Sequence, residues 1–337
     1  MNQFDDGQGG ARAQQQARFD EARDALEAAL HEIKRVIVGQ DAMLERLLVA
    51  LLAGGHVLLE GVPGLAKTLT IKTTAQVLGG SFRRIQFTPD LVPSDLVGTR
   101  IFRPDAGSFD TELGPVFCNF LLADEINRAP AKVQSALLEV MQERQVTIGH
   151  ATYPVPSPFL VMATQNPIES EGTYPLPEAQ VDRFMLKVLI GYPEHDEELT
   201  IVQRQLADEP ELRQVLSLEE LKALQATVRS IYVDPQLISY AVDVATATRE
   251  PTDYVAYGVS PRGPISLVQS ARALAVVRGR EYVLAEDLQS LAKDALRHRL
   301  VLTYQALAEG VTADAILENV LASVPMPQLD LGRVSAA

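Results

Sequence analysis

Five short runs of apolar residues dominate the first half of the chain, at residues 57–60, 82–87, 120–124, 159–164 and 184–190. Stretches of helical character separate the runs. Their hydrophobicity is nearly continuous and does not alternate strictly with polar residues. This pattern is typical of strands in a parallel sheet that helices cover on both faces. It predicts an α/β domain with a five-stranded parallel sheet.

The segments on either side of these runs have helical periodicity. From about Phe19 to Val36, apolar residues recur at the spacing of an amphipathic helix. Residues 1–17 consist largely of Gln, Gly, Ala and Asp, and predict a flexible polar tail. We therefore expect an α/β domain over residues 18–192 and a helical domain over 193–337.

Helix start signals follow one another in the second half, where strand signals are missing after Tyr192-Pro193. Ser217-x-x-Glu220 is a capping box. Asp234-Pro235 and Ser260-Pro261 each place a capping residue before a proline at the expected first helical position. Thr312 is expected to open a last helix. These signals predict a domain built from helices alone.

A loop with the composition of a phosphate-binding cradle, Gly-Val-Pro-Gly-Leu-Ala-Lys-Thr, follows the first run at residues 61–68. Small residues let backbone N–H groups turn toward an anion, and the next helix directs its positive dipole end to the same place. We expect Lys67 to reach the outer phosphates and Thr68 to hold Mg²⁺. Ala66 stands where the usual pattern has its second fixed glycine. The predicted nucleotide contacts are Gly61, Val62, Pro63, Gly64, Leu65, Ala66, Lys67, Thr68 and Leu69.

Two adjacent carboxylates, Asp124 and Glu125, end the third apolar run. Such a pair suits the end of a buried strand that emerges into a ligand crevice. Asp124 is expected to orient Mg²⁺, largely through its water shell, and Glu125 to polarise the attacking water. The alternative is an acidic strand end on the surface, without a catalytic role.

Gln165-Asn166-Pro167 ends the fourth run. An amide at a strand end beside the carboxylates could hold the attacking water or contact the γ-phosphate. Asn166-Pro167 could equally start a turn, because a residue before proline is driven to extended geometry. The two interpretations are compatible.

With these elements the chain resembles the MoxR family of AAA+ ATPases, from about Ile37 to residues 324–327. The resemblance implies a P-loop nucleotide-binding domain and a small all-helical lid domain that together bind ATP or ADP with Mg²⁺ and hydrolyse ATP. Ala66 agrees with this family. The motifs that carry the resemblance are residues 61–68, 86–95, 122–129, 137–148, 163–169, 172–184 and 260–262.

The family also implies roles for single residues. Asn166 falls at the sensor-1 position, and Arg183 matches the arginine finger that completes a neighbouring subunit's site. For Arg183 the alternative is a buried salt bridge with Asp182 or Glu178. Arg262 matches sensor 2, which couples the lid to the γ-phosphate. An anionic partner would suit a cation in a helix's first turn.

Two segments resemble family insertions. Residues 86–100 would decorate the helix after the second strand, and residues 145–155 read as a β-hairpin across Gly149-His150-Ala151. In the family such insertions face the ring surface or pore and touch partners. The alternative is a scaffolding role. Arg128 is a further residue that could face a neighbouring subunit.

Composition narrows the functional classes. The 337 residues include 30 basic and 44 acidic side chains, a net charge of −14, with no Lys/Arg-rich run, which disfavours a continuous nucleic-acid track. No apolar run is long enough to cross a bilayer, and no signal peptide is visible. Cys118 is alone and fits a reducing compartment. Five histidines without ligand spacing disfavour a metal site beyond the nucleotide's Mg²⁺. These features predict a cytoplasmic protein.

The sequence thus predicts a ring motor, expected to be hexameric, that hydrolyses ATP at sites shared between subunits. By the family resemblance it would remodel a partner with a von Willebrand factor A domain, in metal-cofactor insertion or complex maturation. One alternative is the motor subunit of a magnesium-chelatase-like enzyme. A nucleic-acid translocase is disfavoured by the charge. A non-hydrolysing switch is disfavoured by the joint presence of Lys67, Asp124, Glu125 and Arg183.

Overall fold

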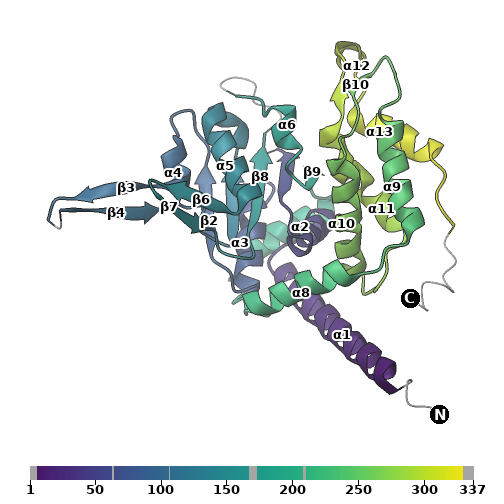
Figure 1. The fold of residues 1–337 in the computed structure, drawn as a ribbon, viewed down its shortest axis with the longest axis horizontal. Helices are drawn as coiled ribbons and strands as arrows, with labels where there is room; N and C mark the ends of the chain where they lie inside the picture. Colours follow the sequence, from purple (N-terminus) through teal and green to yellow (C-terminus); the bar gives the residue numbers. More distant parts are fainter. Residues whose placement is uncertain (1–5, 63, 106, 167–172, 208–209, 329–337) are drawn as a thin grey trace.

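A five-stranded parallel sheet forms the centre of the first domain in the computed structural model, which describes residues 6–62, 64–105, 107–166, 173–207 and 210–328 (Figure 1). The strand order is β2-β5-β8-β1-β9, and every neighbouring pair is parallel. This confirms the predicted sheet. The strands are β1 Val57–Gly61, β2 Phe82–Gln86, β5 Phe120–Asp124, β8 Leu160–Gln165 and β9 Leu186–Ile190.

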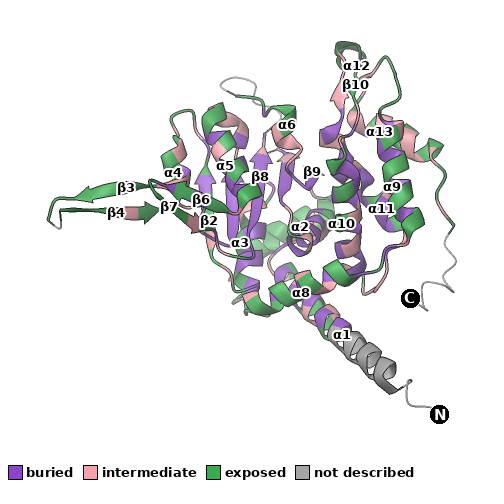
Figure 2. Ribbon diagram, viewed as in Figure 1, coloured by how far each residue is buried: buried purple, intermediate pink, exposed green. Residues whose placement is uncertain are grey.

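Both faces of the sheet are covered, which explains the nearly continuous hydrophobicity of its central strands (Figure 2). Alternate residues of one strand point to opposite faces. Val57 and Leu59 of β1 join a core with helices α2 (Asp41–Ala53) and α3 (Lys67–Val77). Leu58 joins a second core with α5 (Ala131–Glu143) and the short α4 (Pro93–Val97).

The first helix is longer than the sequence predicts. Helix α1 spans Asp6–Lys34, so it begins inside the segment for which a flexible tail is expected. The structure thus describes residues 6–17 as helix, where the sequence predicts a polar tail, and residues 1–5 lie outside the described part. Apolar periodicity marks only the half of α1 that packs on the domain, where Leu26, Ala29 and Ile33 are buried.

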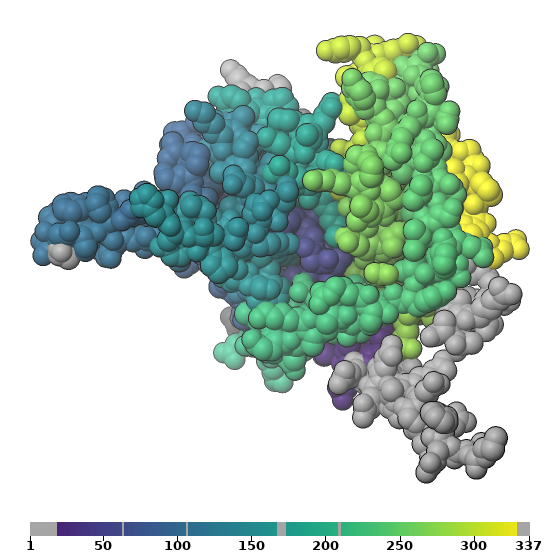
Figure 3. All heavy atoms as spheres, viewed as in Figure 1, coloured from purple at the N-terminus to yellow at the C-terminus, as the bar shows by residue number. Residues whose placement is uncertain are grey.

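Two β-hairpins extend from the α/β domain. The predicted hairpin is confirmed as β6 (Gln145–Ile148) and β7 (Ala151–Pro154), with Gly149-His150 as its turn. A second, longer hairpin of β3 (Gly98–Arg103) and β4 (Ser108–Leu113) is not predicted by the sequence. It projects far from the domain (Figures 1 and 3), and most of its side chains are exposed.

The second domain is helical. Three predicted caps are confirmed: the side chains of Ser217, Asp234 and Thr312 accept bonds from backbone N–H groups of the helices they open. The helices after β9 are α7 His195–Gln205, α8 Leu218–Ser230, α9 Pro235–Ala247, α10 Arg262–Val277, α11 Ala285–Leu296, η2 Arg297–Arg299, α12 Tyr304–Glu309 and α13 Ala313–Ser323.

Two details of the helical domain differ from the prediction. Helix α10 begins at Arg262, so Pro261 is the capping position and not the first helical residue. A short antiparallel ribbon, β10 (Val255–Tyr257) with β11 (Val301–Leu302), interrupts the helices. The domain boundary after residue 192 stays a prediction. Within the described residues, no helix has both the length and the apolar character that a bilayer crossing needs.

Candidate functional site

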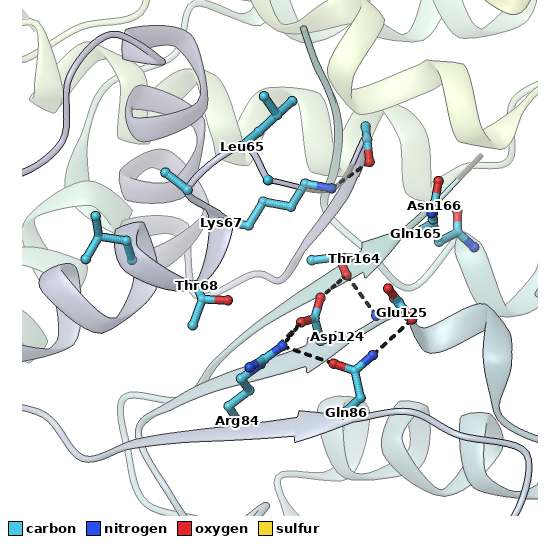
Figure 4. A pocket seen from close by; sticks show the side chains of 14 residues that line it. Leu65, Lys67, Thr68, Arg84, Gln86, Asp124, Glu125, Thr164, Gln165 and Asn166 are labelled. Atoms are coloured by element: carbon cyan, nitrogen blue, oxygen red, sulfur yellow. Dashed lines mark hydrogen bonds and ion pairs between the residues drawn. The ribbon is translucent and has the colours of Figure 1, made fainter. Parts of the chain in front are cut away.

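A cavity of about 400 Å³ lies at the carboxyl edge of the sheet, where β1, β5 and β8 end (Figure 4). The phosphate-loop candidates and both carboxylates of the 124–125 pair line it together. The sequence motifs therefore meet in space as expected. The lining residues are Gly61, Gly64, Leu65, Ala66, Lys67, Thr68, Leu69, Arg84, Gln86, Asp124, Glu125, Thr164, Gln165 and Asn166.

The backbone of the loop explains its composition. Gly64 (φ 87°) and Ala66 (φ 53°) both have positive φ, and Ala66 is the N-cap of α3. A glycine would adopt this conformation freely, whereas a residue with a Cβ is strained there by roughly 1–2 kcal/mol. Ala66 thus occupies the left-handed position for which the general pattern keeps a glycine. The chain accepts this strain where it must turn N–H groups toward a ligand.

Lys67 is the first residue of α3, and its side chain extends along the loop. Its Nζ donates a hydrogen bond to the carbonyl oxygen of Gly61, 2.7 Å away. Burial lowers the pKa of Lys67, and the charges of Asp124, Glu125 and Glu60 oppose that shift. The ammonium is therefore held at the base of the cavity, facing the carboxylates.

Asp124 and Glu125 are joined through one hydroxyl. Thr164 Oγ1 donates to Asp124 Oδ1 (2.7 Å) and accepts from the backbone N–H of Glu125 (2.8 Å). Glu125 itself has a left-handed backbone, with φ 56°. Such strain at a polar, cavity-lining residue is typical of a functional position. The pair is therefore organised by the neighbouring strand β8 and differs from a simple acidic strand end.

Residues of β2 and η1 (Ile126–Arg128) complete the acidic cluster (Figure 4). The guanidinium of Arg84 contacts Asp124 Oδ2 at 2.6 Å, and Gln86 Nε2 donates to Glu125 Oε2 at 2.9 Å. Arg128 Nε lies 3.1 Å from the same Glu125 oxygen. The sequence alone does not mark Arg84, Gln86 and Thr164 as residues of the site. These three residues could be found only from their place near the ends of β2 and β8. Both strands flank β5, and parallel strands bring their carboxyl ends to one edge of the sheet.

The donors and acceptors of this cavity fit a nucleotide with its divalent cation. The loop offers N–H groups and an ammonium to phosphate oxygens. Asp124 Oδ2 already faces a cation, the guanidinium of Arg84. Thr68 supplies a hydroxyl to the same cavity. Oxygen ligands of this kind suit Mg²⁺.

The remaining predicted positions have three different outcomes. Asn166 lines the cavity and is 8% exposed, in agreement with a role beside the carboxylates. Val62 follows β1 but does not line the cavity. Pro63 and Pro167 lie outside the described residues.

Arg183 and Arg262 are not brought to this cavity. Both line a second cavity of about 230 Å³, together with His56 and with Arg144 at the end of α5. His56 directly precedes β1, so this cavity opens at the amino edge of the sheet. Because β1 has five residues, at about 3.3 Å each, the two edges are separated by roughly 16 Å. Within the described residues, no ion pair joins Arg183 to Asp182 or Glu178, so the predicted alternative is not observed.

His56 and Arg144, which line the second cavity, are both held by hydrogen bonds to the backbone. His56 accepts from the N–H of Val161 (3.0 Å) and its other ring nitrogen contacts the carbonyl of Met141 (3.2 Å). Burial, and secondarily the charge of Arg144, lower the pKa of His56 to about 3. Arg144 donates to the carbonyls of Phe159 and Gly54. The imidazole is neutral at pH 7, so the positive charge of this cavity comes from arginines.

Known proteins agree with this architecture. Residues 56–186 match the ATPase family associated with various cellular activities (AAA), and residues 247–320 match an AAA lid domain. A solved structure of an ATPase candidate from Cytophaga hutchinsonii superposes with a TM-score of 0.89. It is 44% identical, and the alignment covers 96% of this chain and 100% of that one.

Two relatives are similar over most of their length. Chaperone MoxR1 of Mycobacterium tuberculosis is 56% identical over 313 residues, which are 90% of this chain and 83% of that protein. Protein MoxR of Paracoccus denitrificans is 32% identical, covering 92% of this chain and 97% of its own. With its nucleotide cavity, its parallel sheet and its lid, the chain belongs to the MoxR family of AAA+ ATPases.

Proposed function

We propose that this ATPase works as a ring, hexameric in its active state, in which each nucleotide site is completed by the neighbouring subunit. The separation of its charged groups carries the proposal. The cavity at the carboxyl edge contains Lys67, Asp124 and Glu125, whereas Arg183 and Arg262 lie at the amino edge. A guanidinium at the amino edge is too far from the nucleotide of its own subunit. In the proposed ring it would meet the nucleotide of a neighbour stacked against that edge.

The two edges then have different tasks. The loop binds the phosphates, Lys67 offsets their charge, and Glu125 orients and polarises the attacking water. A Mg²⁺ ion held through Asp124 and Thr68 would offset charge on the phosphoryl oxygens. Arg183 of the adjoining subunit would stabilise charge that develops on the transferring group, and its Arg262 would contact the same phosphate. ATP binding would thus favour assembly, because the bound nucleotide gains contacts that only the ring provides.

The protein that this ATPase acts on, its client, is part of the same proposal. We assign the MoxR-type role, remodelling of a protein with a von Willebrand factor A domain during metal-cofactor insertion or complex maturation. The support is similarity to MoxR proteins along most of the chain. A cytoplasmic location fits the single cysteine, Cys118, which is buried and free.

Turnover as a function of protein concentration tests the shared site. ATP hydrolysis per subunit should rise steeply over the concentrations at which mass measurements in ATP detect six-subunit rings. Arg183→Ala should bind nucleotide normally and remain nearly inactive at every concentration. Full turnover by a species that is monomeric by mass would contradict the proposal.

The client is tested separately. Tagged Glu125→Gln protein, loaded with ATP, should retain a partner carrying a von Willebrand factor A domain, and Lys67→Ala protein should not. Retention of the same proteins by both variants would contradict this assignment.

A further inference from the structure

The carboxylate of Asp182 lies beside Arg183 in the chain and near Arg262 in space. Asp182 directly precedes Arg183 and caps the short helix α6 (Glu178–Val181). Its Oδ2 accepts a hydrogen bond from Ser260 Oγ at 3.0 Å and lies 4.0 Å from Arg262 Nε. Ser260 Oγ in turn accepts from the backbone N–H of Arg262, at 3.2 Å. Asp182 therefore joins the turn that carries Arg183 to the first turn of α10.

The other oxygen of Asp182 is held by a buried arginine of the lid. Arg299 Nε donates to Asp182 Oδ1 at 2.6 Å, and the Arg299 side chain is 1% exposed. Its other N–H groups donate to the backbone carbonyls of Asp182 (3.0 Å) and Phe184 (2.8 Å) in this turn. They also donate to the Ser266 hydroxyl (3.0 Å) and to the carbonyl of Ala295, both in the lid. Every bond from Arg299 to this turn fixes the lid and the Arg183 segment relative to one another.

Neighbouring residues of η2 strengthen this link. His298 Nε2 lies 3.0 Å from the carbonyl oxygen of Phe184, and Arg297 donates to that of Lys187 at 2.7 Å. The three residues of η2 thus contact Asp182, Phe184, Met185 and Lys187. A displacement of the lid would carry the Arg183 turn with it.

The charges around Asp182 do not balance. Four arginines and one aspartate line the cavity. Arg144 is directed to carbonyl oxygens, and Arg299 neutralises Asp182. Burial lowers the pKa of Arg299, Asp182 opposes that shift, and the charge of Arg262 adds to it. Two guanidinium groups, Arg183 and Arg262, are left to attract an anion.

We propose that Asp182 is a positioning residue that holds Arg183 and Arg262 as one two-cation clamp for a phosphate of the neighbouring subunit's nucleotide. The inference rests on the proposed function, because it takes the shared site as given. Arg299 supplies the buried counter-charge that keeps Asp182 from repelling that phosphate. At 4.0 Å the contact of Asp182 with Arg262 is loose, so Arg262 can turn to a phosphate while Ser260 keeps its place.

Asp182→Asn tests the clamp, because it removes the charge and keeps the shape of the side chain. Turnover at saturating ATP should fall on the order of tenfold or more, the scale for losing a charged hydrogen-bond partner. Binding of a fluorescent ATP analogue should stay within about twofold of the wild type, because each subunit's own cavity lies at the other edge. Ser260→Ala, a milder change that keeps Asp182, should lower turnover about threefold. Glu178→Gln, an equal charge change on the exposed start of α6, should have no effect.

Mixing separates positioning from a general structural defect. Asp182→Asn subunits should regain turnover when mixed with Glu125→Gln subunits, because the first keep an intact cradle and the second an intact clamp. They should not regain it when mixed with Arg183→Ala subunits. If Glu125→Gln and Arg183→Ala themselves fail to complement in proven mixed rings, the proposed function falls and the inference with it. The inference alone is overturned in two cases, both with Glu125→Gln and Arg183→Ala complementing each other. In the first, Asp182→Asn and Ser260→Ala both hydrolyse ATP at the normal rate. In the second, Asp182→Asn and Ser260→Ala regain turnover with Arg183→Ala and not with Glu125→Gln.

Discussion

The two ends of the five-stranded sheet carry opposite kinds of chemistry. At the carboxyl edge, Lys67 and Arg84 face Asp124 and Glu125, so charges of both signs already compensate one another inside one chain. At the amino edge, arginines outnumber the single carboxylate, Asp182. One edge is equipped to bind a nucleotide with its cation, and the other to attract an anion that its own chain does not provide. The difference teaches that the amino-edge half of the proposed site is recognised by its excess of positive charge in a smaller cavity.

Removing the candidate arginine finger, Arg183, should lower ATP turnover more than any other change. We expect Arg183→Ala to lower the turnover number by roughly 10³–10⁵, the range for a guanidinium supplied across an interface. Nucleotide affinity should be unchanged, because Arg183 does not line the cradle cavity. Steady-state hydrolysis and equilibrium binding of an ATP analogue measure the two quantities. Arg183→Lys should keep part of the rate, since the charge remains. A loss of nucleotide binding by Arg183→Ala would contradict the claim that only the carboxyl edge binds the nucleotide of its own subunit.

Removing the buried lid arginine should affect stability. Arg299→Met leaves Asp182 without its buried partner, which costs about 3–5 kcal/mol in the free energy of unfolding. Denaturant unfolding monitored by circular dichroism measures this loss. The exposed Arg229 on α8 provides a matched control, and Arg229→Met should stay within about 0.5 kcal/mol. Equal stability of the Arg299 variant and the wild type would show that the link between lid and sheet is not structural.

At the carboxyl edge, Lys67→Ala should impair both binding and turnover. Losing a charged donor directed at the phosphates should lower turnover on the order of 10²–10³-fold. In contrast to Arg183→Ala, the affinity for ATP should fall as well. Lys72→Ala, at an exposed position of the same helix α3, is the matched control and should behave as the wild type. Normal ATP affinity in the Lys67 variant would contradict the assignment of the cradle.

Acidification should weaken the amino edge through His56, with a smaller effect. Its pKa is about 3 in the folded chain, against about 6.5 when unfolded. The unfolded state therefore binds more protons between these values, and stability is lost as pH falls below 6.5. The expected loss from this residue is about 1.4 kcal/mol per pH unit. Buried His298, whose pKa is also lowered, acts in the same direction.

The measurement compares how strongly the free energy of unfolding depends on pH in the two proteins. Urea unfolding at pH 6.5 and pH 5.5 should show a smaller pH dependence for His56→Gln than for the wild type, whatever the absolute stability of the variant. Equal slopes for the two proteins would mean that His56 is not held neutral at the floor of the second cavity.

The sequence predicts the carboxyl edge well because its parts lie at strand ends. Buried strands are visible as apolar runs, and the residues after them are brought together by the parallel arrangement. Arg84 and Gln86 escape notice because β2 is an edge strand in which only Ile85 is buried. Nothing in its pattern separates a functional side chain from a solvated one.

Elements that bury little are predicted poorly. The β3–β4 hairpin has no buried face in the described structure, since all its strand residues except Gly98 and Thr111 are exposed. Alternation of buried apolar and exposed polar residues therefore does not mark it. The amino edge is the hardest case, because Asp182, Ser260 and Arg299 are far apart in the chain and meet only through packing of the lid.

A mixing assay tests the central claim, that each active site combines the carboxyl edge of one subunit with the amino edge of the next. Glu125→Gln and Arg183→Ala proteins are purified separately, each is confirmed to hydrolyse ATP poorly, and the two are then mixed under conditions where mixed rings form. Turnover should recover, because some interfaces pair an intact Glu125 with an intact Arg183. No recovery in rings proven to contain both variants would contradict the shared site.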